Sequence, residues 1–280
     1  MIKLGLTGYP LGHSLSPTIH TAALKSCGLD GSYELFAIHP DNIPELKDLL
    51  ARVRNREITG LNVTIPHKQN VIHLLDELTP TANAIGAVNT IYKRGNKLVG
   101  ENTDAPGFLS DLKRFLTTET QRHGDLEALV LGAGGSARGI VYALVNDGWN
   151  VTLAARRVEQ AEELASFFTQ FKLPITNFQL STIDLSNLTL VVNTTPVGMT
   201  PNIDQSPWPG NLPFPPHAVI YDLVYNPRET KLVREACAQG LRATTGLGML
   251  IEQAALAFEI WTGHKPSREI MFEAAHQTAH

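Results

Sequence analysis

An apolar run leads directly into a glycine-rich turn at Leu126-Glu-Ala-Leu-Val-Leu131-Gly132-Ala133-Gly134-Gly135-Ser136-Ala137. The pattern G-x-G-x-x-A between a strand and a helix is typical of a dinucleotide-binding unit. Gly132 allows a tight turn, Gly134 lets the backbone approach a pyrophosphate, and Ala137 permits close packing of the helix on the strand. The N–H groups and dipole at the helix start then favour phosphate. The alternative is a glycine turn with a purely structural role.

The end of the next expected strand indicates which nucleotide is bound. NAD-binding units carry an acid there that accepts the ribose hydroxyls. This chain instead has Ala154-Ala155-Arg156-Arg157, with no acid before Glu159. Guanidinium groups attract a 2′-phosphate and can hold it through two parallel hydrogen bonds. We therefore predict NADP as the cofactor. The alternative is that both arginines lie at an exposed helix start, where cations oppose the helix dipole.

Length and composition favour a globular enzyme of two domains or one large one. The chain has 280 residues, of which 43% are hydrophobic and 18% charged, and its net charge is −4. No block of like charge favours nucleic acid, and no apolar stretch approaches the roughly 18 residues of a membrane span. We therefore expect a small-molecule substrate and neither a nucleic-acid nor a membrane partner. A monomer and a homodimer both stay open.

The two cysteines, Cys27 and Cys237, are far apart and belong to no CxxC pair. The spacing predicts neither a zinc site nor a disulfide framework, so no metal is expected. We expect both thiols to be buried in helices as small apolar side chains. The apolar run at the start of the chain is too short for a secretory signal. A cytoplasmic protein is the expectation that fits these features.

Strand and helix patterns alternate along the whole chain, which predicts an α/β architecture with parallel sheets. Strands are expected at 3–8, 32–38, 60–65, 126–131, 151–155, 188–193 and 219–224, with a hairpin of 87–92 and 97–101. Helices are expected from 16, over 42–53, from 66, over 106–116 and over 249–262. Residues 116–125 are polar and aperiodic, which indicates a linker, and the six prolines of 201–216 predict a long loop.

Four segments carry hydroxyl, amide and charged groups where an expected strand ends or a helix begins: His13–Pro17, Asn62–Lys68, Gly86–Thr90 and Glu101–Asp104. In open α/β sheets such ends face the ligand crevice. Hydroxyl and amide groups suit a ring with several hydroxyls. Ser14, Ser16 and the following helix start offer donors to a ring carboxylate. A ketone that receives hydride needs a proton donor, and Lys68 and Asp104 are the ionisable candidates.

Each of these groups also has a structural explanation. Ser16 suits the N-cap of the helix whose first position Pro17 would occupy. The other structural alternatives are turn-stabilising amides at Asn62 and Asn89, a solvated Lys68, a helix-capping Asp104, and structural or exposed rings at His13 and His67. The joint occurrence of these groups favours the chemical interpretation.

The ordered motifs resemble those of the shikimate dehydrogenase family over nearly the whole chain. The matching segments are Gly8–Pro17, Asn62–Lys68, Gly86–Thr90, Asn102–Asp104, Gly132–Arg138, Asn193–Met199, Tyr221–Pro227, and Gly246–Leu250 followed by Gln253. The resemblance implies two α/β domains. Residues 1–104 and 250–280 would form a substrate-binding domain with a mostly parallel sheet, to which the C-terminal helices return. Residues 105–249 would form a Rossmann-type NADP-binding domain.

The resemblance also implies a reaction, the reversible NADPH-dependent reduction of 3-dehydroshikimate to shikimate in aromatic amino-acid and chorismate biosynthesis. Lys68 and Asp104 would be the catalytic pair. Ser14 and Ser16 would receive the substrate carboxylate, with Tyr225 nearby. The ring hydroxyls would be contacted by Asn62, Thr64, Asn89, Asp104 and Gln253. The cofactor would be lined by Gly132, Ala133, Gly134, Gly135, Ser136, Ala137, Arg156, Arg157, Thr194, Gly246 and Met249.

The chain departs from the family pattern at two places. It has His20-Thr21 where a His-Asn pair is common, and Ala155-Arg156-Arg157 where the family usually has Asn-Arg-Thr, with Gln160 at the expected second arginine. Phosphate binding would therefore rest on Arg156, with Arg157 as the compensating cation. Two rival functions stay open: a quinate or broad-substrate dehydrogenase on the same scaffold, and a non-catalytic NADP-binding sensor.

Overall fold

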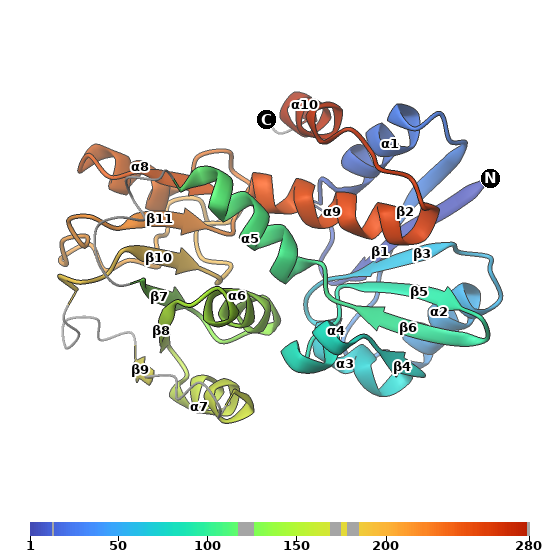
Figure 1. Cartoon of the computed structure of the whole chain (residues 1–280), viewed down its shortest axis with the longest axis horizontal. Helices are drawn as coiled ribbons and strands as arrows, with labels where there is room; N and C mark the ends of the chain where they lie inside the picture. Colours follow the sequence, from blue (N-terminus) through green and yellow to red (C-terminus); the bar gives the residue numbers. More distant parts are fainter. Residues whose placement is uncertain (13, 117–125, 169–174, 178–184, 279–280) are drawn as a thin grey trace. The chain divides into compact units, whose positions relative to one another are not determined.

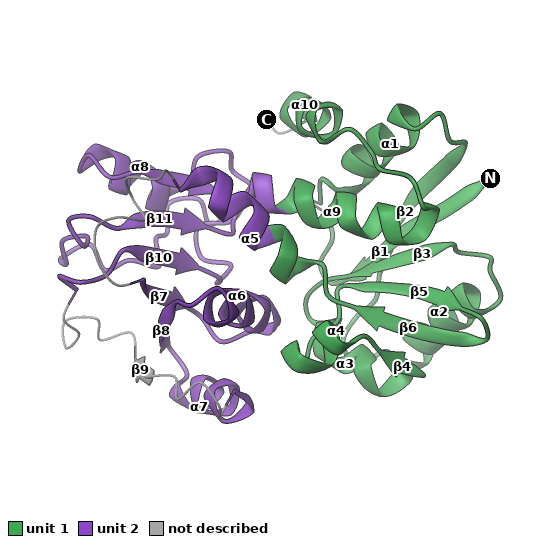
Figure 2. Cartoon of the chain, in the orientation of Figure 1, with its two compact units in different colours: residues 1–107, 250–279 green, residues 108–249, 280 purple. Residues whose placement is uncertain are grey.

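The computed structural model describes residues 1–12, 14–116, 126–168, 175–177 and 185–278. It contains two compact units (Figure 2). Unit 1 comprises Met1–Gly107 with Leu250–Ala279, and unit 2 comprises Phe108–Met249 with His280. Within the described residues, no helix combines the length and the apolar character needed to cross a bilayer. The expected linker lies, apart from Leu116, outside the described residues.

Unit 1 contains a six-stranded sheet in the order β2-β1-β3-β5-β6-β4 (Figure 1). Its strands are β1 Ile2–Gly8, β2 Gly31–Ala37, β3 Gly60–Val63, β4 Glu77–Leu78, β5 Thr90–Arg94 and β6 Lys97–Glu101. Strand β1 pairs in parallel with β2 and β3, and β4 with β6, whereas β5 runs antiparallel to β3 and β6. The β5–β6 hairpin confirms the expected one, and Gly95 in its turn has a φ of +59°.

The helices of unit 1 are α1 Ser16–Ser26, α2 Ile43–Arg54, α3 His67–Asn70, the 3₁₀ turn η1 Val71–Leu74, α4 Pro80–Ile85 and α10 Arg268–Thr278, together with most of α9 Leu247–Thr262. Helix α2 shows why an expected element forms. Its Leu46, Leu49, Leu50 and Val53 fall on one face and are buried in the core that includes β3. Helix α10 packs on α1, so the C-terminal helices return to the first unit as expected.

Unit 2 contains a six-stranded, all-parallel sheet in the order β12-β11-β10-β7-β8-β9. Its strands are β7 Glu127–Leu131, β8 Asn150–Ala155, β9 Ile175–Asn177, β10 Leu190–Asn193, β11 Val219–Asp222 and β12 Ala243–Thr245. Numbered within the unit, this order is 3-2-1-4-5-6, the arrangement of dinucleotide-binding Rossmann domains. The helices α6 Gly135–Asn146, α7 Val158–Phe167 and α8 Lys231–Ala238 lie in unit 2, and α5 Asp104–Phe115 ends in it. The expected fold class is confirmed.

The prediction that both cysteines are buried is wrong. Cys27 is half-buried at the C-terminal end of α1, and Cys237 is exposed on α8. Helix α8 buries Leu232, Val233 and Ala236, and these residues form the face that meets the core, so Cys237 falls outside it. Neither thiol is in a disulfide.

Candidate active site

The two ionisable candidates, Lys68 and Asp104, form a direct ion pair. The distance from Lys68 Nζ to Asp104 Oδ2 is 2.6 Å, and the two side chains are only 10% and 6% exposed. Both structural alternatives are therefore wrong. The lysine is not solvated, and Asp104 is the first residue of α5, whose start is stabilised by Asn102 Oδ1 accepting from the Ala105 N–H. A nearly buried charge persists only when it is paired, and these two groups pair with each other.

The backbone explains how Lys68 reaches this position. After β3, the His67 N–H donates to the Thr64 carbonyl, which closes a turn and begins the short helix α3. The Lys68 carbonyl accepts from the Val88 N–H at 2.7 Å, which ties α3 to the segment before β5. His67 is fully buried, and its Nε2 lies 2.8 Å from the Ile38 carbonyl, which agrees with the structural alternative.

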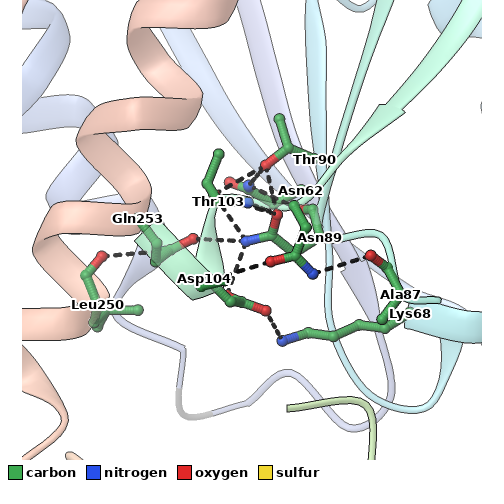
Figure 3. Close-up of polar contacts among 11 residues, drawn as sticks. Asn62, Lys68, Ala87, Asn89, Thr90, Thr103, Asp104, Leu250 and Gln253 are labelled. Atoms are coloured by element: carbon green, nitrogen blue, oxygen red, sulfur yellow. Dashed lines mark hydrogen bonds and ion pairs between the residues drawn. The ribbon is translucent and has the colours of Figure 1, made fainter. Parts of the chain in front are cut away.

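Asn89 connects the ion pair to the rest of unit 1 (Figure 3). Its Nδ2 donates to Asp104 Oδ1 and Thr103 Oγ1, both at 2.9 Å, and to Gln253 Oε1 at 3.2 Å. Its Oδ1 accepts from the Thr103 N–H at 2.8 Å. Gln253 lies on α9, and its Nε2 donates to the Leu250 carbonyl. One buried network therefore gathers candidates that are 164 positions apart in sequence.

Asn62 enters the same network from β3. Its Nδ2 donates to the Asn89 carbonyl at 3.1 Å and to Thr90 Oγ1 at 3.3 Å, and its Oδ1 accepts from the Tyr33 hydroxyl at 2.8 Å. Motif reasoning gave no role to Tyr33, Thr90 or Thr103. Thr90 and Thr103 lie inside the quoted motifs, which was the available signal. Tyr33 lies on β2, outside every quoted motif, so no sequence signal pointed to it.

The loop after β1 contains Ser14, and α1 begins at Ser16. Thr64 directly follows the neighbouring strand β3. The Thr64 N–H donates to the Thr7 carbonyl, so the chain after β3 stays beside the end of β1. The Ser14 Oγ accepts from the Ser16 N–H at 3.2 Å. The expected N-cap role of Ser16 is wrong: Leu15 occupies that position, and Ser16 is a buried residue of α1. No hydrogen bond joins these three side chains to the Asn89 network in the described part of the chain, and His13 lies outside that part.

The glycine turn of unit 2 has the geometry that a dinucleotide site needs. Gly132 has a φ of +110°, and a Cβ on it would lie 2.6 Å from Thr194 Oγ1, so only glycine fits. A Cβ on Gly134 would meet nothing within 4 Å, which leaves open space above the turn. Helix α6 begins at Gly135, and the fully buried Ala137 lets it pack closely. These residues can hold a pyrophosphate at a helix N-terminus.

The other candidate site residues of unit 2 follow strands of the same sheet, and they include Tyr225, which is a candidate for substrate binding. Thr194 follows β10, Tyr225 follows β11, Gly246 and Met249 follow β12, and Arg156 follows β8. In an open parallel sheet these carboxyl ends form the ligand-binding edge. Arg156 and Arg157 are exposed, and neither is ion-paired within the described residues. Two guanidiniums placed in this way at the edge fit a 2′-phosphate. No cluster of three or more metal-ligating side chains occurs in the ranges that the structure describes.

The buried carboxylate of Asp222 connects the end of β10 with the loop that follows β11. It ends β11, is fully buried, and accepts from Asn193 Nδ2 at 2.8 Å, from the Val224 N–H at 3.0 Å and from Thr230 Oγ1 at 2.7 Å. Burial raises the pKa of Asp222 from 3.8 to about 6, although the three donors favour the ionised form. Asp222 therefore holds its proton in the native state at pH values where an unfolded aspartate has lost it.

We expect this shift to appear as a pH-dependent stability difference between the wild type and Asp222→Asn. Native Asp222 releases its proton near pH 6 and the unfolded residue near 3.8, so wild-type stability falls as pH rises between these values. Two pKa units correspond to on the order of 2–3 kcal/mol. Asparagine cannot titrate. The free energy of unfolding of the wild type, relative to that of the variant, should therefore be lower at about pH 7 than at about pH 4 by that amount, and urea unfolding at the two pH values measures it. Parallel pH curves would contradict the assignment.

Family models and a named relative identify the family of this chain. Residues 6–91 match the shikimate dehydrogenase substrate binding domain, and residues 246–276 match the shikimate 5′-dehydrogenase C-terminal domain. A protein of Salinibacter ruber named shikimate dehydrogenase (NADP(+)) is 41% identical, and the alignment covers 96% of this chain and 95% of that protein.

Solved structures give the same result. A shikimate dehydrogenase in complex with NADP+ is 37% identical, with a TM-score of 0.91 over 100% of this chain and 96% of that one. Shikimate 5-dehydrogenase from Thermus thermophilus, in complex with NADP(H) and shikimate, is 40% identical, with a TM-score of 0.85 over 99% of each chain. The resemblance inferred from the motifs is confirmed, and this chain belongs to the shikimate dehydrogenase family.

Proposed function

We propose that this protein is an NADP-dependent shikimate dehydrogenase, which reduces 3-dehydroshikimate to shikimate and catalyses the reverse oxidation. The observation that carries the proposal is the 2.6 Å ion pair of Lys68 and Asp104 inside a network of amide and hydroxyl groups. Family membership supplies the substrate class. Unit 1 acts as the substrate-binding part and unit 2 as the NADP-binding part. The protein acts in the cytoplasm, which suits its two free thiols.

Proton transfer is assigned to Lys68. Reduction of a ketone places negative charge on its oxygen, and a positioned N–H donor stabilises that charge and supplies the proton. Asp104 has no N–H to give, and its Oδ2 accepts from Lys68 Nζ, so it orients the ammonium group. Bound NADPH supplies the hydride. The remaining polar groups orient the ring, because reaction requires a fixed approach of the two reacting atoms.

The binding roles follow the chemistry of each group. The hydroxyls of the ring are assigned to Asn62, Thr64, Asn89, Asp104 and Gln253. Its carboxylate is assigned to Ser14 and Ser16, with Tyr225 as a further contact. The pyrophosphate is assigned to the glycine turn, because Gly134 leaves open space beside the start of α6. The 2′-phosphate is assigned to Arg156, assisted by Arg157, and Thr194, Gly246 and Met249 line the rest of the cofactor site.

A nicotinamide absorbance assay tests the proposal against both rivals. The purified protein is given NADP+ and a panel of ring acids that includes shikimate and quinate. We expect NADPH to form with shikimate, with a kcat/KM well above that for quinate, which has an extra hydroxyl beside its carboxylate. Equal kcat/KM values would favour a broad-substrate enzyme. NADP+ binding without turnover of any ring acid would favour a sensor and contradict the proposal.

A further inference from the structure

A one-way chain of hydrogen bonds runs from strand β2 to the Asp104 carboxylate. The Tyr33 hydroxyl donates to Asn62 Oδ1 at 2.8 Å, and Asn62 Nδ2 donates to Thr90 Oγ1 at 3.3 Å. The Thr90 hydroxyl donates to Asn89 Oδ1 at 3.0 Å, and Asn89 Nδ2 donates to Asp104 Oδ1 at 2.9 Å. Every link donates in the same direction. Such chains polarise their members, so each bond depends on its neighbours.

Fixed acceptors and donors outside the chain determine its direction. The Asn89 backbone carbonyl can only accept, so the Nδ2 of Asn62 must point toward it, and the Oδ1 must face Tyr33. The Thr103 backbone N–H can only donate, so the Oδ1 of Asn89 must point toward it. At the end of the chain, the Asp104 carboxylate accepts from Asn89 and from Lys68. Turning either side-chain amide around would place two acceptors or two donors against each other in a buried site, which is unfavourable.

Tyr33, the first donor, is held by aromatic packing. It is buried at 8% exposure, and its ring stacks on the His20 ring with centroids 4.4 Å apart and an interplanar angle of 5°. His20 is fully buried on α1, and burial lowers its pKa to about 3, so the ring is neutral at neutral pH. Trp261 of α9 lies on His20 as well, with centroids 5.5 Å apart. Three elements of unit 1 therefore fix the place of the hydroxyl.

We propose that Tyr33 is a positioning residue of this active site, whose hydroxyl orients the Asn62 amide and, through Thr90 and Asn89, the Asp104 carboxylate. The proposal rests on the proposed function, in which Asn62 binds the substrate and Asp104 orients Lys68. In Tyr33→Phe the ring and its packing remain, but the donor to Asn62 Oδ1 is gone. A buried acceptor without its donor is unfavourable, so the Asn62 amide is held less rigidly, and substrate binding and turnover suffer.

A double-mutant cycle tests the proposal. Steady-state kinetics with shikimate and NADP+ are measured for the wild type, Tyr33→Phe, Asn62→Ala and the double variant. Tyr33→Phe should lower kcat/KM for shikimate by about five- to tenfold, the effect of one lost hydrogen bond, and change the KM for NADP+ by less than about twofold. In the Asn62→Ala background the same change should add less than about twofold, because the chain is already cut. An equal loss in both backgrounds, or no loss in the wild type, would overturn the proposal.

Two further variants separate the chain from its surroundings. Tyr92→Phe makes the same chemical change at a half-buried tyrosine of β5 outside the chain, and it should leave kcat/KM within about twofold. Thr90→Val removes the hydroxyl that forms the second and third links while keeping the shape of the side chain, so it should lower kcat/KM and again make Tyr33→Phe nearly silent. A large loss in Tyr92→Phe, or additive losses in Thr90→Val, would instead assign the effect of Tyr33 to packing.

A measurement without substrate keeps this proposal separate from the proposed function. If the wild type does not oxidise shikimate, the proposed function fails. The hydrogen-bond chain is then tested by urea unfolding of the same four proteins. The shift in unfolding midpoint caused by Tyr33→Phe should fall by at least about half in the Asn62→Ala background, because both changes break one chain. Equal midpoint shifts in the two backgrounds would show that Tyr33 and Asn62 are not coupled, and would contradict the proposed hydrogen-bond chain.

Discussion

Replacement of Lys68 by alanine is expected to lower kcat for shikimate oxidation by a factor of about 10²–10⁴, the range that general acid–base catalysis contributes. The KM for shikimate should change far less, because the group acts mainly on the charge that develops in the transition state. Steady-state kinetics at saturating NADP+ measure both constants. The physical reason is the position of the Lys68 Nζ, which its bond to Asp104 holds nearly out of water.

Lys47→Ala is the matched control, because Lys47 is an exposed lysine of α2 outside the Asn89 network. It should leave kcat within about twofold. Removing Lys68 leaves the Asp104 carboxylate buried without its cation, which destabilises the protein. Thermal unfolding therefore accompanies the kinetics, and Lys68→Met, which keeps most of the apolar stem, serves as a second variant. A folded Lys68 variant with wild-type kcat would remove the lysine from the mechanism.

Replacement of Arg156 by alanine is expected to raise the KM for NADP+ by about 10- to 100-fold, the effect of losing charge-assisted hydrogen bonds. The KM for NAD+ should change by less than about threefold, because NAD+ lacks the 2′-phosphate that the guanidinium would hold. The ratio of kcat/KM for the two cofactors is the quantity to measure. Arg156 is exposed and has no ion pair within the described residues, so its loss breaks no such contact that would obscure the result.

Two other arginines complete this experiment. Arg157→Ala measures the share of the second guanidinium, which begins α7 as its N-cap residue. Arg234→Ala removes an exposed cation of α8 and should change neither KM by more than about twofold. If Arg156→Ala weakens NADP+ and NAD+ by the same factor, the arginine does not bind the 2′-phosphate.

The fold was largely predictable because its signals are local. The glycine turn between β7 and α6 needs only short-range conformational preferences, and α2 shows its apolar face in four residues. The family resemblance implied C-terminal helices, but the residues themselves did not predict helix α10 or its bounds. It buries only Met271 and Ala275, so its apolar pattern is weak, and its place depends on tertiary packing against α1.

The candidate site was predictable only in part, because motifs name residues without giving their partners. Lys68 and Asp104 were both identified, but their direct contact depends on the pairing of segments 36 positions apart. The capping role given to Asp104 is wrong because Asn102, two positions earlier, supplies the oxygen. Tyr33 was missed because an isolated tyrosine on a strand indicates burial and no particular hydrogen bond. Such roles are set by tertiary contacts.

A crystal structure of the protein with shikimate and NADP+ is the most direct measurement of the central claim. We predict that the ring hydroxyl to be oxidised lies within about 3 Å of the Lys68 Nζ, the reach of a proton transfer. We also predict that the pyrophosphate lies on the turn at Gly132–Ala137 and that the nicotinamide meets the same ring. Shikimate bound away from the Lys68–Asp104 pair, or a nicotinamide remote from that pair, would contradict the account.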